Sequence, residues 1–560
     1  MFDLWDKIQE TLHLKPQQSF MGGIVHNNQH KITGSQPIVA CAMPDMLIHP
    51  IKQHIGDPCE PIVGVGERVL RGQVIAKAQG YVSVPVHAST SGTVERIEEH
   101  TIPHPSGYGL TSIFIKPDGL DEVDESLHPL PNYRSVDAVE LRERIRQAGI
   151  AGLGGAVFPT FIKLVHDQQH AIETVVLNGI ECEPWLTCDH QLMLEKTHEI
   201  ISGLDIILHL IESNKGIIAI EDNKPDAIAV MQKTIADMGL ADVVQVHVLP
   251  TRYPQGGEKQ LIQAITGKEV PAGGLPSHIG VLSTNVGTSK AIYDAVCLGE
   301  PLTERVITVS GDAVPRPTNM LVRLGTSMHF LLAQAGIDSF DEIKIIHGGP
   351  MMGELLTNDD APVVKASNGI LAMYQKSVMR AHHDEEPCIR CGDCGEVCPA
   401  GLMPNLLAQH CKEDQFERAQ DYNLFDCIEC GACSYVCPSH IPLVHYFRYG
   451  KGQVAQIQRE KAFSEESRMR SEKRDARLAK ELAEKEEKRR IAKEKKEARA
   501  KALAEKQAAE DATSSVEAGS AGKPSIEASS ENRDKVVNKT VDENADKDAP
   551  KEVNKPEETT

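Results

Sequence analysis

The stretches CIRCGDCGEVCP (388–399) and CIECGACSYVCP (427–438) share one spacing, C-x2-C-x2-C-x3-C-P. Nine of the 14 cysteines lie in this part of the chain. Four thiolates at this spacing cannot comfortably reach one cubane, so three cysteines of each run bind one 4Fe–4S cluster and the fourth binds the other. The sequence therefore predicts two 4Fe–4S clusters with crossed ligation.

The predicted ligands divide into two sets of four. Zinc ligands or free thiols are the alternatives, but two complete runs favour iron–sulfur. Cys411 lies between the runs and fits neither, so we expect it to be a small buried apolar residue. The insert around it has apolar residues at helical spacing, which predicts helices. The first cluster would take Cys388, Cys391, Cys394 and Cys437, and the second Cys398, Cys427, Cys430 and Cys433.

A pair of clusters passes one electron at a time, so the rest of the chain should supply a source or a sink. The segment GIAGLGGAVFPTFIK (149–163) is a candidate, because its glycines let the backbone approach a phosphate or a flat ring. A helix following the loop would favour negative charge at its N-terminus. The residues before the loop, 137–148, read as a helix, so this is not the dinucleotide-binding fingerprint, and a plain tight turn is the alternative.

Downstream of the glycine loop, strand and helix patterns alternate. Strands are predicted at 174–184, 216–222 and 243–250, with helices at 190–212 and 225–238 between them. This order indicates an α/β sheet with helices on its faces. Ligands of such sheets lie at the carboxyl ends of the strands, and here those ends run into loops rich in Gly, Asn and Glu.

These segments resemble the flavoprotein subunit of respiratory complex I. The glycine loop is similar to its flavin-binding loop, and NGIECEP (178–184), YPQGGEKQLI (253–262) and STNVGT (283–288) are similar to three further segments of that family. The resemblance implies a Rossmann-like domain that binds FMN and NADH. Leu153, Leu164 and Thr284 depart from the pattern of that family, which affects the nicotinamide contacts more than the flavin contacts.

The resemblance also implies roles for individual residues. Hydride transfer needs no acid–base residue, so no catalytic residue is nominated. The flavin phosphate and ring would be held by Gly152, Gly154, Gly155, Ala156 and Lys163. The cavity would be lined by Asn178, Glu181, Glu183, Tyr253, Gly257, Glu258, Asn285 and Thr288.

Over residues 1–450, the combination of modules resembles the RnfC component of the Rnf/Rsx electron-transport complex. Residues 62–97 resemble a barrel-sandwich hybrid without its carrier lysine, and 303–355 resemble a soluble-ligand-binding β-grasp module. The expected fold is multidomain α/β and α+β. The expected segments are a barrel-sandwich domain at 1–130, a flavin/NADH domain at 131–300, a β-grasp module at 301–370, a helical two-cluster domain at 371–452, a charged helix at 453–507 and a disordered tail at 508–560.

Charge is distributed unevenly along the 560 residues. The net charge is −21, while 459–507 carry 18 Lys/Arg against 12 Asp/Glu and 508–560 carry 7 against 13. These two segments cancel, so the body of the protein is acidic. Together with an aromatic content of 4%, this argues against a nucleic-acid partner. An apolar N-terminal face (Phe2, Leu4, Trp5, Ile8, Leu12) is expected to form a capping helix rather than a secretory signal.

The resemblance implies a peripheral, NADH-oxidising subunit on the cytoplasmic side of the inner membrane. Its partners would be integral membrane and ferredoxin-like subunits of a complex that couples electron transfer to ion translocation. Its cofactors would be FMN and two 4Fe–4S clusters. The alternatives are a soluble flavin/iron–sulfur reductase, such as a cobalamin reductase, and a non-catalytic redox relay that has lost its flavin.

Overall fold

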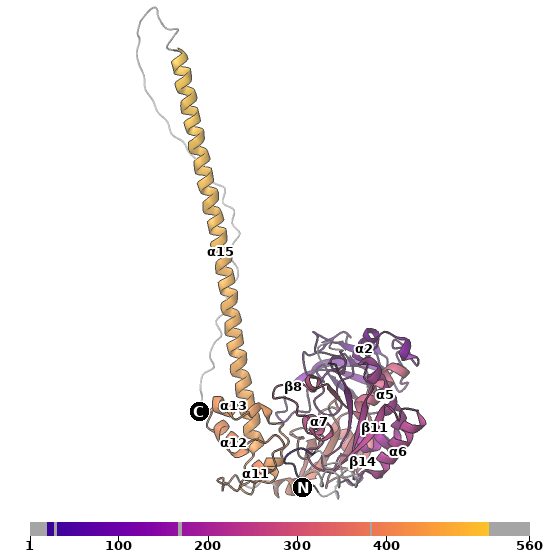
Figure 1. Ribbon diagram of the computed structural model, residues 1–560. Coiled ribbons are helices and arrows are strands. Elements are labelled where there is room, and N and C mark those ends of the chain that lie inside the picture. Colours follow the sequence, from indigo (N-terminus) through magenta and orange to yellow (C-terminus); the bar gives the residue numbers. More distant parts are fainter. Residues whose placement is uncertain (1–18, 27–30, 166–170, 381–383, 515–560) are drawn as a thin grey trace, which may run out of the picture. The chain divides into compact units, whose positions relative to one another are not determined.

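The computed structural model describes residues 19–26, 31–165, 171–380 and 384–514. Their chain falls into two compact units, Met1–Lys461 and Ala462–Thr560 (Figure 1). The predicted N-terminal helix and the part of the predicted tail after 514 lie outside the described residues.

Two small antiparallel sheets pack face to face near the N-terminus. Their strands alternate buried and exposed residues, and Val69, Ile75, Val94 and Ile113 meet in the core between them. This two-sheet sandwich agrees with the barrel expected for this region. One sheet has the order β2 (Leu47–Pro50), β8 (Gly109–Pro117), β7 (Gly92–Thr101), β4 (Arg68–Val69), and the other β3 (Glu60–Pro61), β5 (Val74–Lys77), β6 (Val86–His87).

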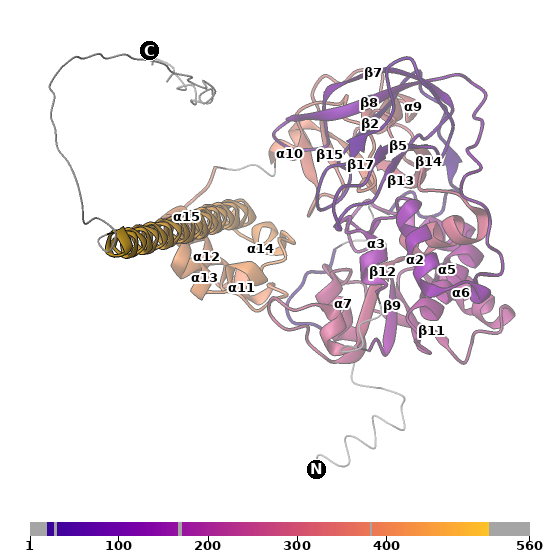
Figure 2. The same ribbon diagram turned by 90° about the horizontal axis from the view of Figure 1, so that it is seen from above.

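The next region is a four-stranded parallel sheet, and this confirms the predicted alternation of strands and helices. Its order is β11-β10-β9-β12, and every neighbouring pair is parallel. Helix α7 covers one face, while α2, α5 and α6 cover the other (Figure 2). The strands are β9 (Thr174–Gly179), β10 (Gly216–Glu221), β11 (Val244–Leu249) and β12 (Val281–Asn285), and the helices are α2 (Ala138–Gln147), α5 (Thr197–Leu210), α6 (Pro225–Asp237), α7 (Glu258–Thr266) and α8 (Val286–Tyr293).

Two helices of this region differ from their predictions. The helix expected at 190–212 is divided into α4 (Cys188–Glu195) and α5, because Lys196 leaves helical geometry at φ −125°. The Thr197 hydroxyl donates to the Met193 carbonyl at this break and competes with the helical ladder. The segment after the glycine loop forms only the single turn α3 (Thr160–Lys163), since Thr160 N–H donates back to the Ile150 carbonyl. The expected helix N-terminus is therefore absent at this point.

A mixed six-stranded sheet follows, with the order β1-β14-β13-β17-β15-β16. Its strand, strand, helix and strand between 303 and 355 confirm the predicted order of elements. The β-grasp classification itself stays a prediction. The elements are β1 (Val39–Ala40), β13 (Glu304–Ser310), β14 (Thr318–Arg323), α9 (Met328–Gln334), β15 (Ile343–His347), β16 (Glu354–Leu356), β17 (Gly369–Tyr374) and α10 (Gln375–Arg380).

The two cysteine runs fold into the same local structure twice. Arg390 and Glu429 occupy equivalent positions and both have positive φ, 58° and 56°. Each is followed by a left-handed glycine, Gly392 or Gly431, that opens a single helical turn. The insert between the runs is helical, as predicted, and Cys411 is fully buried. The helices are α11 (Asp393–Glu396), α12 (Pro404–Lys412), α13 (Phe416–Asp421) and α14 (Ala432–Tyr435).

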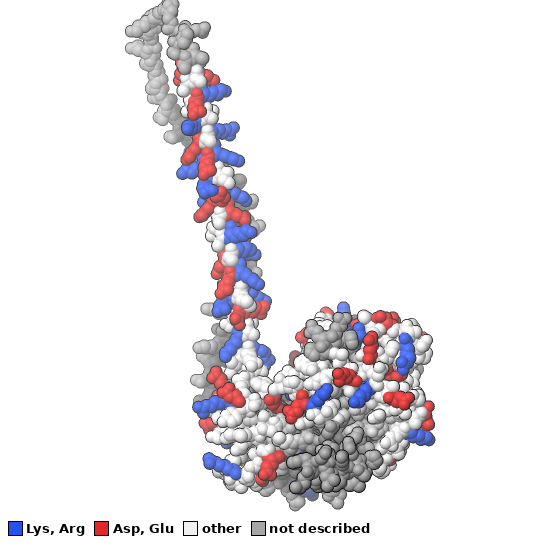
Figure 3. Space-filling view, viewed as in Figure 1, with Lys and Arg blue, Asp and Glu red and all other residues white. Residues whose placement is uncertain are grey.

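Helix α15 (Leu443–Ser514) is longer than the charged helix expected at 453–507. It begins within the segment assigned to the cluster domain and continues into the predicted tail. The reason is that 453–514 contain neither Gly nor Pro and are rich in Ala, Glu, Lys and Arg, the best helix formers. Acidic and basic side chains are interspersed along it (Figure 3). No helix among the described residues is long and apolar enough to cross a membrane.

Candidate flavin and iron–sulfur sites

The glycine loop presents an open stretch of backbone. Gly152 N–H donates to the Phe158 carbonyl at 2.9 Å, so the residues between them form a tight excursion. Gly154, Gly155 and Ala156 at its tip are exposed. Gly155 has φ +127°, and a Cβ there would meet no atom within 4 Å. Backbone of this kind fits a flat ring or a phosphate, which is what the FMN assignment requires.

The loop rests on the N-terminus of α8. Leu153 N–H donates to Thr288 Oγ1 at 2.9 Å. A Cβ on Gly154 would lie 3.2 Å from the Cβ of Asn285. Asn285 caps α8 by accepting from Gly287 N–H at 2.8 Å. The structure therefore brings two of the predicted cavity residues, Asn285 and Thr288, directly to the predicted flavin loop.

A second contact joins the loop region to the ends of β12 and α7. Lys163 Nζ lies 2.9 Å from Glu258 Oε1 and donates to the Ser283 carbonyl at 3.3 Å. Gly257 is the N-cap of α7, and Asn178 Nδ2 donates to the neighbouring Gly256 carbonyl at 2.9 Å. These residues surround the carboxyl ends of β9 and β12, where ligands of parallel sheets bind.

Three other predicted cavity residues have their polar atoms engaged elsewhere. Glu181 is buried and accepts from Asp189 and His190 N–H at the start of α4. The Glu183 carboxylate accepts from Met351 and Met352 N–H at 3.0 and 2.9 Å, and burial raises its pKa to about 7. Tyr253 is buried and donates to a cysteine carbonyl of the cluster domain. A part in ligand binding for Glu181, Glu183 and Tyr253 stays a prediction.

A buried lysine that the sequence did not single out holds the NGIECEP loop. Lys31 Nζ donates to the carbonyls of Glu181, Glu183 and Leu186 at 2.6, 2.8 and 2.5 Å. Burial lowers the pKa of Lys31. Nothing near position 31 in the sequence indicates this contact, because its partners are about 150 residues away.

The N-terminal sandwich also contacts the glycine loop. Ile55 N–H donates to the Val157 carbonyl at 3.3 Å. Val157 has φ +45°, a conformation that a β-branched residue rarely adopts, so the contact supports a strained position. The ring of Tyr81 lies edge-on to Phe161 at 5.8 Å. Since the two segments are distant in the sequence, the pattern of residues gave no signal for this contact.

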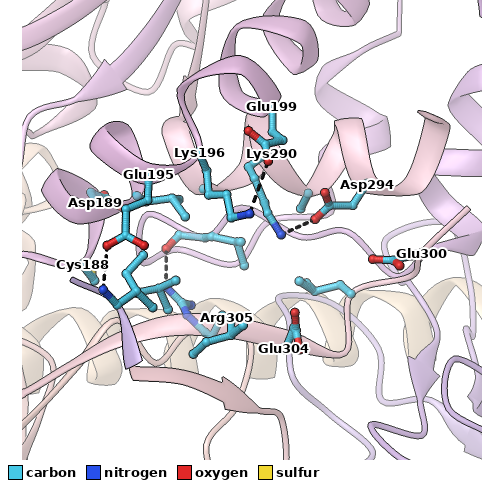
Figure 4. Close-up of a pocket in the computed structure, with 18 of the residues that line it drawn as sticks. Cys188, Asp189, Glu195, Lys196, Glu199, Lys290, Asp294, Glu300, Glu304 and Arg305 are labelled. Atoms are coloured by element: carbon cyan, nitrogen blue, oxygen red, sulfur yellow. Dashed lines mark hydrogen bonds and ion pairs between the residues drawn. The ribbon is translucent and has the colours of Figure 1, made fainter. Parts of the chain in front are cut away.

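A cavity of about 400 Å³ lies on the other side of Leu153 from the open face of the loop (Figure 4). Cys188 and Asp189 of α4 line it together with Lys290 of α8 and Arg305 of β13. Its wall carries six acidic side chains and three basic ones. This excess of negative charge is unsuited to a flavin phosphate, which keeps the flavin assignment on the open face.

The first set of cluster cysteines lines one hollow. Cys388, Cys391 and Cys394 of the first run surround it together with Cys437 of the second run. The pKa of Cys394 is raised first by burial and also by the neighbouring Cys391 and Cys437. This grouping agrees with the crossed arrangement that the spacing predicts, in which the fourth cysteine comes from the other run.

The second set is more deeply buried. The pKa of Cys433 is raised by burial and then by the nearby Cys430, Cys427 and Cys398. Leu402 N–H points at Cys398 Sγ at 3.4 Å, a contact that stabilises a thiolate. Among the described residues, no three His, Cys, Asp or Glu side chains converge on a point where they could hold a single metal ion. The sulfur donors and their crossed grouping fit the 4Fe–4S assignment, whose ligands bind separate irons.

Comparison with known families assigns three parts of the chain. Residues 145–294 match the family described as Nuo51 FMN-binding domain, and 18–120 match the RnfC barrel sandwich hybrid domain. Residues 380–438 match the 4Fe-4S dicluster domain. These matches confirm a mixed α/β multidomain protein with FMN and 4Fe–4S clusters as its cofactors.

Two curated relatives are both named as the RnfC-type component of an ion-translocating oxidoreductase complex. That of Yersinia pestis bv. Antiqua is 46% identical over 468 residues, covering 83% of this chain and 74% of the relative. That of Pseudomonas aeruginosa is 44% identical over 463 residues, covering 83% of this chain but only 59% of the relative, less than two thirds of its length. The crystal structure of an air-oxidized NAD+-reducing NiFe hydrogenase is 18% identical, with a TM-score of 0.41 over 50% of this chain and 54% of that chain.

Proposed function

Because this chain belongs to the RnfC family of ion-translocating oxidoreductase complexes, we propose that it is the NADH-oxidising, electron-transferring subunit of such a complex. When bound at the glycine loop, FMN would convert the two-electron chemistry of NADH into single-electron transfers. The residues of this chain hold the flavin, bring the two clusters into a wire and present the end of that wire to a partner.

The contact between the cluster domain and the α/β domain supports this proposal and gives the wire a direction. Tyr253, after β11, donates its hydroxyl to the Cys430 carbonyl at 2.6 Å. Cys430 packs in one apolar group with Tyr253, Ile24 and Met351. The second cluster therefore lies on the side of the flavin domain and would receive electrons first.

The first cluster has the features of an exit. Cys388 and Cys391 are exposed, whereas Cys398, Cys430 and Cys433 are buried. Ile389, between the exposed pair, has 68% of its surface exposed. An apolar residue exposed beside a cluster is suited to transient contact with a ferredoxin-like subunit, since it lets the two proteins exclude water along the electron path.

The order of the clusters can be tested by removing the exit. In Cys391→Ala, the first cluster should be lost, while NADH should still reduce the remaining cluster fully, because that cluster is adjacent to the flavin domain. The measurement is the EPR signal after anaerobic addition of NADH, compared with that after dithionite. A remaining cluster that only dithionite reduces would show that the order is reversed.

Attachment to the membrane is proposed to depend on partner subunits on the cytoplasmic face of the inner membrane. The acidic body is repelled by anionic headgroups, and the positive excess of 459–507 is offset by 12 acidic residues in the same segment. Contacts made by the first compact unit, Met1–Lys461, should therefore dominate.

Truncation after Lys461 tests this attachment. This boundary retains Val454, which is buried and would be lost with a shorter fragment. The truncated protein should remain in the membrane fraction when the other subunits are present, and the full-length protein expressed without them should be found in the soluble fraction. Release of the truncated protein would instead assign the attachment to the distal part of α15.

A further inference from the structure

A buried lysine joins three parts of the fold behind the glycine loop. Lys365 lies between β16 and β17 and only 1% of its surface is exposed. Its ammonium donates to the Gly149 carbonyl at 2.6 Å and to the Pro85 carbonyl at 2.9 Å. Gly149 begins the glycine loop, and Pro85 belongs to the N-terminal sandwich. One side chain therefore fixes the start of the loop to two neighbouring modules.

The charge of this lysine is uncompensated. No carboxylate among the described residues forms an ion pair with Lys365. Its titratable neighbours have pKa values that are shifted first by burial and then by the charge of Lys365; they are His49, His54, His87 and Cys59. Burying an ammonium without a counter-ion opposes folding, so a site that retains one has a use for the charge.

A second buried cation lies behind the other end of the loop. Arg305 has 7% of its surface exposed and donates to the Leu153 carbonyl at 3.3 Å. It also donates to the backbone carbonyl of Lys365. Arg305 is close to Asp189 across the cavity of Figure 4, whereas Lys365 has no such partner among the described residues. The net positive field behind the loop therefore comes mainly from Lys365.

We propose that Lys365 is a positioning residue that holds the start of the glycine loop and places a positive charge behind it, so that the open face favours an anionic flavin ligand. The inference rests on the proposed function, since it takes FMN as the occupant of the loop. The phosphate of FMN is anionic in both redox states, and the reduced ring adds further negative charge. The charge of Lys365 should therefore stabilise reduced FMN more than oxidised FMN.

Replacing the ammonium tests the field. Lys365→Met keeps the length of the side chain and removes its charge. The apoprotein should still bind FMN, but reduced FMN should lose about tenfold more affinity than oxidised FMN, which lowers the midpoint potential by about 30 mV for a two-electron couple. Lys365→Arg should restore the potential. Lys215→Met, at an exposed position of the same domain, is the control for charge removal and should leave the potential unchanged.

The pH dependence gives an independent readout in the intact wild-type protein. Burial lowers the pKa of Lys365 to about 8, so its charge is present below pH 8 and is lost as the pH rises through that value. The lowered pKa values keep His49, His54 and His87 neutral above pH 7, and the raised pKa keeps Cys59 a thiol through pH 9. The wild-type flavin potential should fall more steeply above pH 8. Lys365→Arg should lack this break, because arginine remains protonated.

The possible outcomes separate the two proposals. A wild-type protein that binds no FMN would refute the proposed function. A wild-type protein that binds FMN, together with an unchanged potential in Lys365→Met, would refute only the role of Lys365. If Lys365→Met does not fold, the comparison of wild type with Lys365→Arg across pH 7–9 decides, and the same break in both would overturn the inference.

Discussion

Cys398→Ala should remove the cluster held by the other cysteine run and leave the cluster of its own run intact. The wild type should contain about eight iron and eight sulfide, and the variant about half of each. The remaining EPR signal should come from the cluster of Cys388, Cys391, Cys394 and Cys437. The physical reason is that Cys398 is grouped with the buried thiols of 427–433 and not with its sequence neighbours. NADH should then fail to reduce the remaining cluster, because the first step of the wire is missing.

Cys411→Ala is the matched control for this experiment. Cys411 is a buried cysteine of the same domain that belongs to neither set. Its replacement should leave iron, sulfide and electron transfer at wild-type levels. If Cys398→Ala lost the cluster of 388–394 instead, the crossed ligation would be wrong.

Gly154→Glu should abolish flavin binding. The new side chain would start 3.2 Å from Asn285 and carry a negative charge to the face that is assigned to a phosphate. Overpacking of about 1–3 kcal/mol, together with like-charge repulsion, should weaken FMN binding by about 100-fold or more. FMN content and NADH–ferricyanide activity should both fall to background, while the iron content stays at the wild-type value.

The same substitution at Gly452 provides a control. Gly452 is exposed in α15, and a Cβ there would meet no atom within 4 Å. Gly452→Glu should retain FMN and activity, because glutamate is a better helix former than glycine. Normal FMN content in Gly154→Glu would exclude this loop as the flavin site.

Local patterns predicted much of the fold. The cysteine spacing indicated both cluster sets, and the alternation of strands and helices indicated the parallel sheet, because each depends on residues close together in the chain. The boundaries of α15 were wrong, since its Ala- and Glu-rich end continues as a helix beyond 507. The helix expected after the glycine loop is a single turn, because Thr160 pairs back with Ile150, a contact that periodicity does not reveal.

The candidate site was predicted only in part for the same reason. Asn285 and Thr288 contact the flavin loop as the resemblance implied, but Glu181 and Glu183 use their carboxylates to hold backbone. Lys31 and Lys365 were missed because their partners come from other modules and lie far away in the sequence. Buried lysines that donate to carbonyls leave no mark on local sequence patterns, so only the tertiary structure reveals them.

Reduction of the clusters by NADH in wild type and in Gly154→Glu tests the central claim most directly. Both proteins are purified anaerobically with full iron content, and their EPR signals are recorded after NADH and then after dithionite. The account predicts that NADH reduces the wild-type clusters, and that only dithionite reduces those of Gly154→Glu. Reduction of the clusters of Gly154→Glu by NADH would contradict the claim that electrons enter through a flavin at the glycine loop.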